Sequence, residues 1–169
     1  MLIGLIADTH GYLDPRVPPA LKGVELILHA GDIGAEGVLV ALASIAPVTA
    51  VAGNNDANLA QLGLPLRVDL NLEGVKLHLV HRLIDAAPGS DTRIIVYGHS
   101  HRAVVVERVG RLWVNPGAAG RVGFHHEVTL ALLRLDDDRC EAELVLLGPR
   151  VAAARLSTAL GHASRRSHL

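Results

Sequence analysis

Histidine, aspartate and asparagine residues gather in five short segments of this chain. The segments are Asp8-Thr9-His10, Gly31-Asp32, Gly53-Asn54-Asn55-Asp56, His81 and Gly98-His99-Ser100-His101. Imidazole and carboxylate groups together suit Mn²⁺, Fe, Zn²⁺ or Ni²⁺ better than Ca²⁺ or Mg²⁺, which prefer oxygen ligands alone. These residue types therefore indicate chemistry assisted by transition-metal ions.

The spacing within two segments gives a local reason for ligands to converge. In an extended chain, residues i and i+2 point the same way, so Asp8 with His10, and His99 with His101, can each face one cleft. Glycines next to three of the segments allow the backbone to turn sharply after a strand. Each motif alone is more often a cap, a turn or a surface histidine, whereas the ordered set of five is hard to obtain by chance.

Apolar runs in the first half of the chain predict the elements that carry these residues. Residues 2–7, 24–29 and 48–52 indicate buried strands, and residues 36–45 have the spacing of a helix. Strands that alternate with short helices favour a largely parallel sheet. Ligand sites in such sheets form at the carboxyl ends of strands, which is where the polar segments lie.

The second half of the chain predicts hairpins. Residues 93–97 indicate one more buried strand, and the expected pairs are 67–72 with 75–80, 104–108 with 111–114, and 128–135 with 140–147. Two sheets packed face to face, with helices outside, would accommodate both halves. We expect one domain over residues 1–149 and a partly helical tail over residues 150–169.

Composition limits the class of protein. Half of the 169 residues are hydrophobic but only 2% are aromatic, so aliphatic side chains must fill the core. The formal charge of −1 argues against a basic face for nucleic acid. The single Cys140 excludes an internal disulfide. The N-terminus does not read as a signal peptide and no apolar run reaches the length of a membrane span, so we expect a cytoplasmic location.

The ordered motifs, together with Asn115-Pro116-Gly117, resemble those of the calcineurin-like metallophosphoesterase superfamily. The compact length is similar to that of the small bacterial and archaeal phosphodiesterase group, which also includes the retromer subunit Vps29. The resemblance covers about residues 1–147. It implies an α/β fold, namely a four-layer αββα sandwich of two mixed β-sheets flanked by helices.

The resemblance also implies two divalent metal ions per chain, with Mn²⁺ preferred and Fe, Zn²⁺ or Ni²⁺ as alternatives. The implied ligands are Asp8, His10 and His101 for the first ion, Asn54, His81 and His99 for the second, and Asp32 between both. Asp32, Asn54 and His99 are also the expected catalytic residues. With a bridging hydroxide the centre keeps a charge near +1, so it would attract a phosphate ester, and the hydroxide would attack phosphorus in line.

The chain departs from the family pattern at two positions near the ligands. Asn55 stands where many members have a histidine that is proposed to protonate the leaving group, and Arg82 follows His81 in place of glycine. We expect Asn55 and Arg82 to bind substrate, with a solvated surface role for Arg82 equally open. Asp56 either assists a histidine or caps a turn.

The remaining histidines have simpler interpretations. His29 ends a strand before Asp32, which predicts a hydrogen bond to a ligand. His78 alternates with apolar neighbours on a strand, and His125 and His126 are expected at the surface.

These features predict a metal-dependent phosphodiesterase that acts on a small phosphate ester, with no nucleic acid or membrane as partner. The chain has no long insertion to build a deep pocket, so an open site is expected. The alternative is a Vps29-like interaction scaffold with little activity, although no expected ligand has been replaced. A homo-oligomer that forms through an exposed hairpin edge stays open on general grounds.

Overall fold

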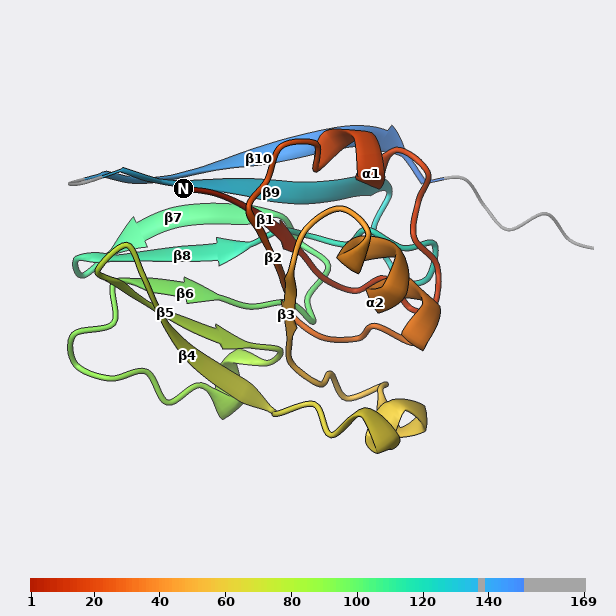
Figure 1. Ribbon diagram of the computed structural model, residues 1–169, viewed down its shortest axis with the longest axis horizontal. Coiled ribbons are helices and arrows are strands. Elements are labelled where there is room, and N and C mark those ends of the chain that lie inside the picture. Colours follow the sequence, from red (N-terminus) through yellow and green to blue (C-terminus); the bar gives the residue numbers. More distant parts are fainter. Residues whose placement is uncertain (137–138, 151–169) are drawn as a thin grey trace, which may run out of the picture.

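The computed structural model describes residues 1–136 and 139–150 of the chain. In these residues ten strands form two five-stranded sheets, which pack against each other, with α1 and α2 on the outer face of one sheet (Figure 1). The predicted α/β fold with two mixed sheets is confirmed. No helix in the described ranges is long and apolar enough to cross a membrane.

The first sheet has the order β10-β9-β1-β2-β3. Its strands are β1 (Leu2–Ile6), β2 (Leu26–His29), β3 (Val48–Ala50), β9 (Glu127–Asp136) and β10 (Arg139–Pro149). The first three are parallel, as the alternation of strands and helices predicts, and β9 joins β1 in antiparallel orientation. The last hairpin therefore completes a sheet that the first fifty residues begin.

The second sheet has the order β4-β5-β6-β8-β7. Its strands are β4 (Arg67–Leu72), β5 (Val75–Val80), β6 (Ile94–Val96), β7 (Val104–Arg108) and β8 (Arg111–Asn115). The three central strands are parallel, while β4 and β7 pair at the edges as the antiparallel arms of hairpins. The sequence predicts the bounds of β4, β5 and β7 correctly and those of the others to within two residues.

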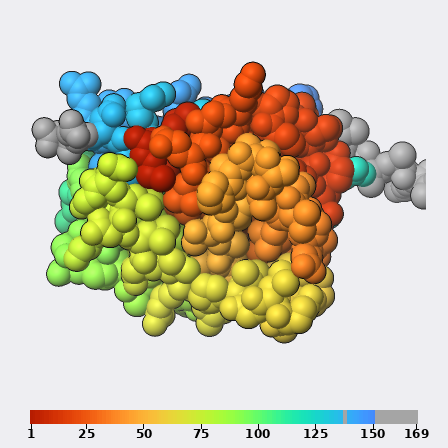
Figure 2. All heavy atoms as spheres, in the orientation of Figure 1, coloured from red at the N-terminus to blue at the C-terminus, as the bar shows by residue number. Residues whose placement is uncertain are grey.

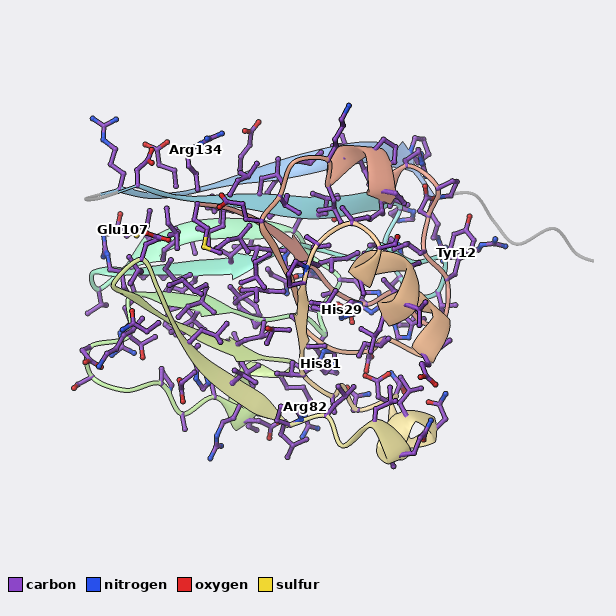
Figure 3. All side chains as sticks on the ribbon, in the orientation of Figure 1. Tyr12, His29, His81, Arg82, Glu107 and Arg134 are labelled. Atoms are coloured by element: carbon purple, nitrogen blue, oxygen red, sulfur yellow. The ribbon has the colours of Figure 1, made fainter. Side chains whose placement is uncertain are left out.

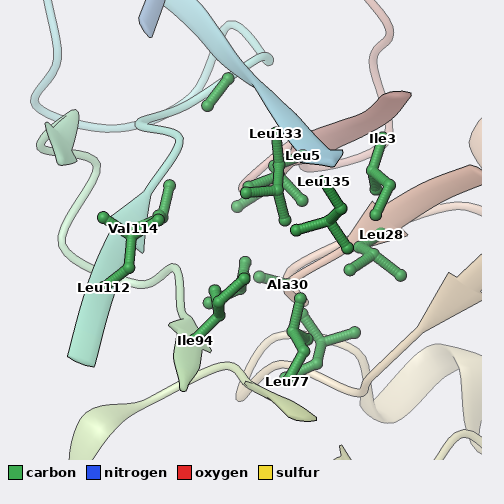
Figure 4. Packing of buried hydrophobic residues seen from close by; sticks show 14 of the residues in the cluster. Ile3, Leu5, Leu28, Ala30, Leu77, Ile94, Leu112, Val114, Leu133 and Leu135 are labelled. Carbon is green, nitrogen blue, oxygen red and sulfur yellow. The ribbon is translucent and has the colours of Figure 1, made fainter. Parts of the chain in front are cut away.

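Aliphatic side chains fill the space between the two sheets. Leu5 of β1 and Leu133 of β9 face Leu77 of β5 and Ile94 of β6, and all are buried (Figure 4). Strands buried on both faces need continuous apolar runs, which is the pattern that identified them. Leu, Ile, Val and Ala thus fill the core of a chain that has few aromatic residues.

A second apolar layer lies between the first sheet and the helices. Val17 and Leu21 from the segment of α1 (Val17–Ala20) and Leu42 of α2 (Glu36–Ala43) pack on Ile27 of β2. The part of the chain that holds α2, β3 and the 3-10 helix η1 (Ala57–Leu62) is orange to yellow in Figure 2 and forms much of that face. A second 3-10 helix, η2, covers Leu83–Asp85.

Two helical expectations have different outcomes. The helix predicted over residues 36–45 starts where expected and ends two residues earlier, at Ala43. The short helix α1 was not predicted. Pro18 and Pro19 lie in the first turn of α1, where their missing N–H groups cost no hydrogen bond. The helix expected in the tail falls on residues 151–169, outside the described part.

Candidate metal centre

The five polar segments meet where strands of both sheets end. Segments 8–10, 31–32 and 53–56 follow β1, β2 and β3 of the first sheet, while His81 and segment 98–101 follow β5 and β6 of the second. Backbone hydrogen bonds join the segments, since Asp8 N–H donates to the Gly31 carbonyl (3.0 Å) and Gly98 N–H to the His81 carbonyl (3.0 Å). The convergence that the sequence predicts is thus present.

Three of the predicted ligands form a first cluster: Asp8, His10 and His101. One ligand atom from each lies within 4.8 Å of the others. Nε2 of His101 is 3.3 Å from Nε2 of His10 and 3.3 Å from Oδ1 of Asp8. Asp8 is fully buried, while the two imidazoles are partly exposed toward solvent.

The second cluster contains Asp32, His81 and His99, again within 4.8 Å of one another. Nε2 of His81 lies 3.3 Å from Oδ1 of Asp32 and 3.1 Å from Oδ1 of Asn54. Nδ1 of His81 donates a hydrogen bond to the Ala30 carbonyl (2.7 Å), so Nε2 is the ring nitrogen that would bind a metal ion after losing its proton. His81 lies near His29 in the middle of the molecule in Figure 3.

Asp32 lies between the two clusters. Its Oδ1 faces His81 at 3.3 Å, and its Oδ2 faces Nε2 of His10, which belongs to the first cluster, at 3.8 Å. Asn55 fixes this orientation, because its backbone N–H donates to Oδ1 (2.9 Å) and its side-chain amide to Oδ2 (2.7 Å). A carboxylate held with one oxygen toward each cluster has the geometry of a bridging ligand.

The donor set fits a pair of metal ions. Oδ1 of Asp8 is buried and has no hydrogen-bond partner in the described residues, although a carboxylate oxygen without a donor is costly to bury. Two ligands about 2.0–2.1 Å from one ion at a tetrahedral angle lie about 3.4 Å apart. The ligand-to-ligand distance of 3.3 Å in the first cluster agrees with that spacing.

The backbone at the ligands is not extended, contrary to the reason given for their convergence. Asp8, His10, Asp32, His99 and His101 all have left-handed φ angles, between 48° and 69°. His99 and His101 lie in different ligand clusters, and both line the same cavity. The pairing of i and i+2 residues is therefore wrong in its mechanism, although every one of these side chains reaches the site.

Electrostatics keeps Asp32 ionised. Burial alone would raise the pKa of Asp32, but hydrogen bonds from His81 and Asn55 hold it well below the usual range. For His81, burial opposes the charged form, yet the nearby Asp32 carboxylate raises the pKa above its ordinary value. Asp32 is therefore an ionised carboxylate that can bind a cation.

Asp56 and Asn115 hold the loops that carry the ligands. The buried carboxylate of Asp56 accepts hydrogen bonds from the N–H groups of Ile33 (3.1 Å), Gly34 (2.8 Å) and Gly53 (2.8 Å). It therefore caps two turns, and it accepts no hydrogen bond from a histidine in the described part of the chain. The Asn115 amide donates to the Gly98 carbonyl (2.8 Å) and fixes the loop of His99 and His101.

The histidines outside the ligand set have mixed outcomes. His29 is buried as expected, but its Nε2–H donates to Thr9 Oγ1 (3.0 Å) rather than to a ligand side chain, and burial lowers its pKa to about 4. His78 lies buried on β5 and contacts Asp69 (2.7 Å). His126 is exposed, as predicted.

His125 was expected at the surface, and that expectation is wrong. Its side chain is 8% exposed, and Nδ1 lies 3.3 Å from Nδ1 of His101. Nε2–H of His125 donates to the Gly120 carbonyl (3.0 Å), so Nδ1 is left to accept a hydrogen bond from His101. Sequence reasoning had no signal for this contact except the glycine-rich turn before it.

The predicted substrate-binding residues lie in different surroundings. Asn55 lines a cavity of about 220 Å³ beside the metal ligands, whereas Arg82 does not. Arg82 is exposed, lies away from His29 in Figure 3, and donates from Nε to Asp85 (2.7 Å). A substrate role for either residue stays a prediction.

The family model and the relatives that match this chain point to the same protein family. A model of the calcineurin-like phosphoesterase superfamily domain matches residues 1–138. A "Probable metallophosphoesterase" of Methanothermobacter thermautotrophicus is 30% identical over 168 residues, which cover 89% of this chain and 95% of the relative. A phosphodiesterase of Methanocaldococcus jannaschii is 27% identical over 139 residues, which cover 69% and 83% of the two chains.

A solved structure extends the likeness to the fold. Wild-type Vps29 from Entamoeba histolytica, in complex with Zn²⁺, superposes with a TM-score of 0.69 at 20% sequence identity. The match covers 86% of this chain and 99% of that chain. At this identity the similarity speaks for the fold alone.

Proposed function

Since this chain belongs to the calcineurin-like phosphoesterase superfamily, we propose that it is a dinuclear metal-dependent phosphodiesterase. The observation that carries the proposal is Asp32, whose two carboxylate oxygens face two separate clusters of ligands. The name of the curated phosphodiesterase from M. jannaschii supports the choice of a diester substrate. Manganese is the metal we propose, and Fe, Zn²⁺ and Ni²⁺ are alternatives that mixed imidazole and carboxylate ligands also suit.

The side chains have separate tasks in this proposal. Asp8, His10 and His101 would hold one ion, His81, His99 and Asn54 the other, and Asp32 both. Bound metals would supply an activated water molecule and positive charge opposite the phosphoryl oxygens. No nucleophilic side chain is required.

The chain itself orients those ligands. The Ala30 carbonyl sets the tautomer of His81, and Asn55 holds Asp32 in its bridging orientation. The exposed His99 and Asn54 lie at the open side of the site, where a substrate would enter. His99 is thus placed to donate a hydrogen bond from its second ring nitrogen to the ester, whereas the buried His81 is not.

The fold also favours a second candidate, an interaction scaffold, because it matches that of Vps29. The complete ligand set argues for the enzyme, since a scaffold needs neither an unpaired buried carboxylate oxygen nor a strained backbone at five ligands. The two candidates differ in whether metal restores hydrolysis.

The test is hydrolysis of bis(4-nitrophenyl) phosphate by metal-stripped protein, to which Mn²⁺ is added back. We expect activity to return with metal and to fall at least 100-fold in Asp32→Ala and His99→Ala. His126→Ala, which removes an exposed histidine outside the site, is the matched control and should retain full activity. Unchanged hydrolysis in the two site variants would refute the assignment, and inactivity with Mn²⁺, Fe²⁺, Zn²⁺ and Ni²⁺ would favour the scaffold.

A further inference from the structure

The metal site has an apolar rim on one side. The cavity of about 220 Å³ is lined by metal ligands and, along one edge, by Val122, Gly123 and Phe124. Phe124 is 100% exposed and Val122 is 56% exposed. Phe124 is the only phenylalanine of the chain, and it lies on the surface rather than in the aliphatic core.

The rim lies directly against a metal ligand. Gly123 has a φ of 120°, and a Cβ at this position would overlap the imidazole of His101. Only a residue without a side chain lets the backbone approach so closely. The flanking Val122 and Phe124 are thereby placed beside the first ligand cluster.

Several contacts hold the rim in place. Nη1 of Arg150 donates to the carbonyls of Arg121 (2.6 Å) and Gly123 (3.0 Å), on either side of Val122. The Arg121 guanidinium stacks on the Tyr12 ring at 3.4 Å. The buried His125 follows Phe124 and anchors the other end through the Gly120 carbonyl. A fixed loop with an exposed aromatic ring is preorganised for binding, because little entropy is lost when a ligand packs on it.

The lack of cationic side chains at the cavity limits the kind of substrate that can bind there. None of the ten residues that line it is a lysine or an arginine. A substrate with a second phosphate beyond the scissile ester would find no cationic partner there. An uncharged planar group would find the face of Phe124, on which rings and nucleobases stack.

We infer that Phe124 and Val122 form a subsite for a planar, apolar ester group of the substrate, so that the enzyme prefers aryl or nucleoside diesters over alkyl diesters. This inference rests on the proposed phosphodiesterase function. Phe124 would bind the group that stays on phosphorus after hydrolysis, while the metal ligands act on the scissile ester.

Two substrates with one leaving group test the subsite. Phenyl 4-nitrophenyl phosphate and methyl 4-nitrophenyl phosphate release the same nitrophenol, so their ratio of kcat/KM reports the retained group alone. We expect Phe124→Ala to lower this phenyl-to-methyl ratio about tenfold, mostly through KM for the phenyl ester. Phe124→Trp should preserve the ratio, and Val109→Ala, which trims a fully exposed residue at the β7–β8 turn, should leave it unchanged.

A binding experiment separates this inference from the proposed function. Phenylphosphonate should bind Mn²⁺-loaded wild-type protein more tightly than methylphosphonate does in calorimetry, and Phe124→Ala should remove the difference. A phenyl-to-methyl ratio that Phe124→Ala leaves intact would overturn the subsite while leaving the phosphodiesterase in place. If the wild type hydrolyses neither ester, the proposed function fails, and equal affinity for the two phosphonates would then overturn the subsite as well.

Discussion

Five of the ligand residues adopt a backbone conformation that is uncommon outside glycine. Asp8, His10, Asp32, His99 and His101 are left-handed, a conformation that costs about 1–3 kcal/mol for a non-glycine residue. The strain is thus stored where ligands from separate strands converge, and bound metal ions would offset it.

At the scale of single residues, His125 should tune the first ligand cluster. In His125→Phe, Nδ1–H of His101 loses its acceptor, so we expect Mn²⁺ affinity to fall about 10- to 100-fold. His125→Gln, whose amide oxygen can accept the same bond, should recover part of the loss. The measurement is Mn²⁺ titration of metal-stripped protein, with His126→Phe as the control for an exposed histidine. Wild-type affinity in His125→Phe would show that the contact has no role.

His29 should make folding stability depend on pH in the metal-free protein. Burial lowers its pKa to about 4 in the folded state, against about 6.5 when unfolded. Between these values only the unfolded chain binds the proton, so the free energy of unfolding should fall as pH drops from 6.5 to 4. Protonation of His29 in the unfolded chain should lower the free energy of unfolding by up to about 3 kcal/mol near pH 4, and this loss is absent above pH 7.

Urea denaturation of the wild type and His29→Asn, both metal-stripped, measures that contribution. The gap in the free energy of unfolding between the two proteins should narrow as pH falls from 7 to 4.5. A gap that stays constant across this range would mean that His29 does not titrate as its burial implies.

At the scale of elements, the strand ends approach so closely that glycine is required between them. A Cβ at Gly53, three residues after the end of β3, would overlap the backbone nitrogen and carboxylate of Asp32, which follows β2. We expect Gly53→Ala to destabilise the fold by about 1–3 kcal/mol and to reduce metal binding, because Asp32 must move.

The control for Gly53→Ala is Gly37→Ala in α2, where a new Cβ meets nothing within 4 Å. There alanine should raise the free energy of unfolding by about 0.5–1 kcal/mol, because it restricts the unfolded chain and favours the helix. Urea denaturation and Mn²⁺ titration of both variants measure the contrast. Equal effects of the two substitutions would refute the claim that strand-end packing shapes the site.

The sequence predicts most of what lies along single elements. Continuous apolar runs marked the buried strands, and polar residues directly after β1, β2 and β6 marked the site, because both patterns are local. The pairing of β9 with β1 is not local, and nothing within residues 127–136 specifies it. His125 was missed for the same reason, since its burial depends on His101, which lies 24 residues away. The left-handed ligands were missed because only a few per cent of non-glycine residues have a positive φ, even though aspartate and histidine are enriched among them.

At the scale of the whole molecule, the metal site joins the two sheets. Asp8, His10, Asp32 and Asn54 follow strands of the first sheet, and His81, His99 and His101 follow strands of the second. Apart from the apolar core, the described residues link the sheets here by hydrogen bonds such as that from His99 N–H to Oδ2 of Asp8 (3.0 Å). Metal ions would add bonds across the same boundary.

Metal binding should therefore stabilise the entire fold. At Mn²⁺ concentrations about 1,000-fold above Kd, the free energy of unfolding should rise by about 4 kcal/mol per site, which for a domain of this size raises Tm by roughly 10 °C. Asp32→Ala should lose most of this shift because it removes a ligand from both clusters, whereas His126→Ala should keep it. Thermal unfolding with Mn²⁺ and with EDTA measures the shift.

Hydrogen exchange tests whether the ions join the two sheets. Mn²⁺ should slow exchange at the ends of both β1 and β6, because opening either end would break bonds to an ion that has ligands from both sheets. Protection confined to one sheet would contradict a centre shared between them.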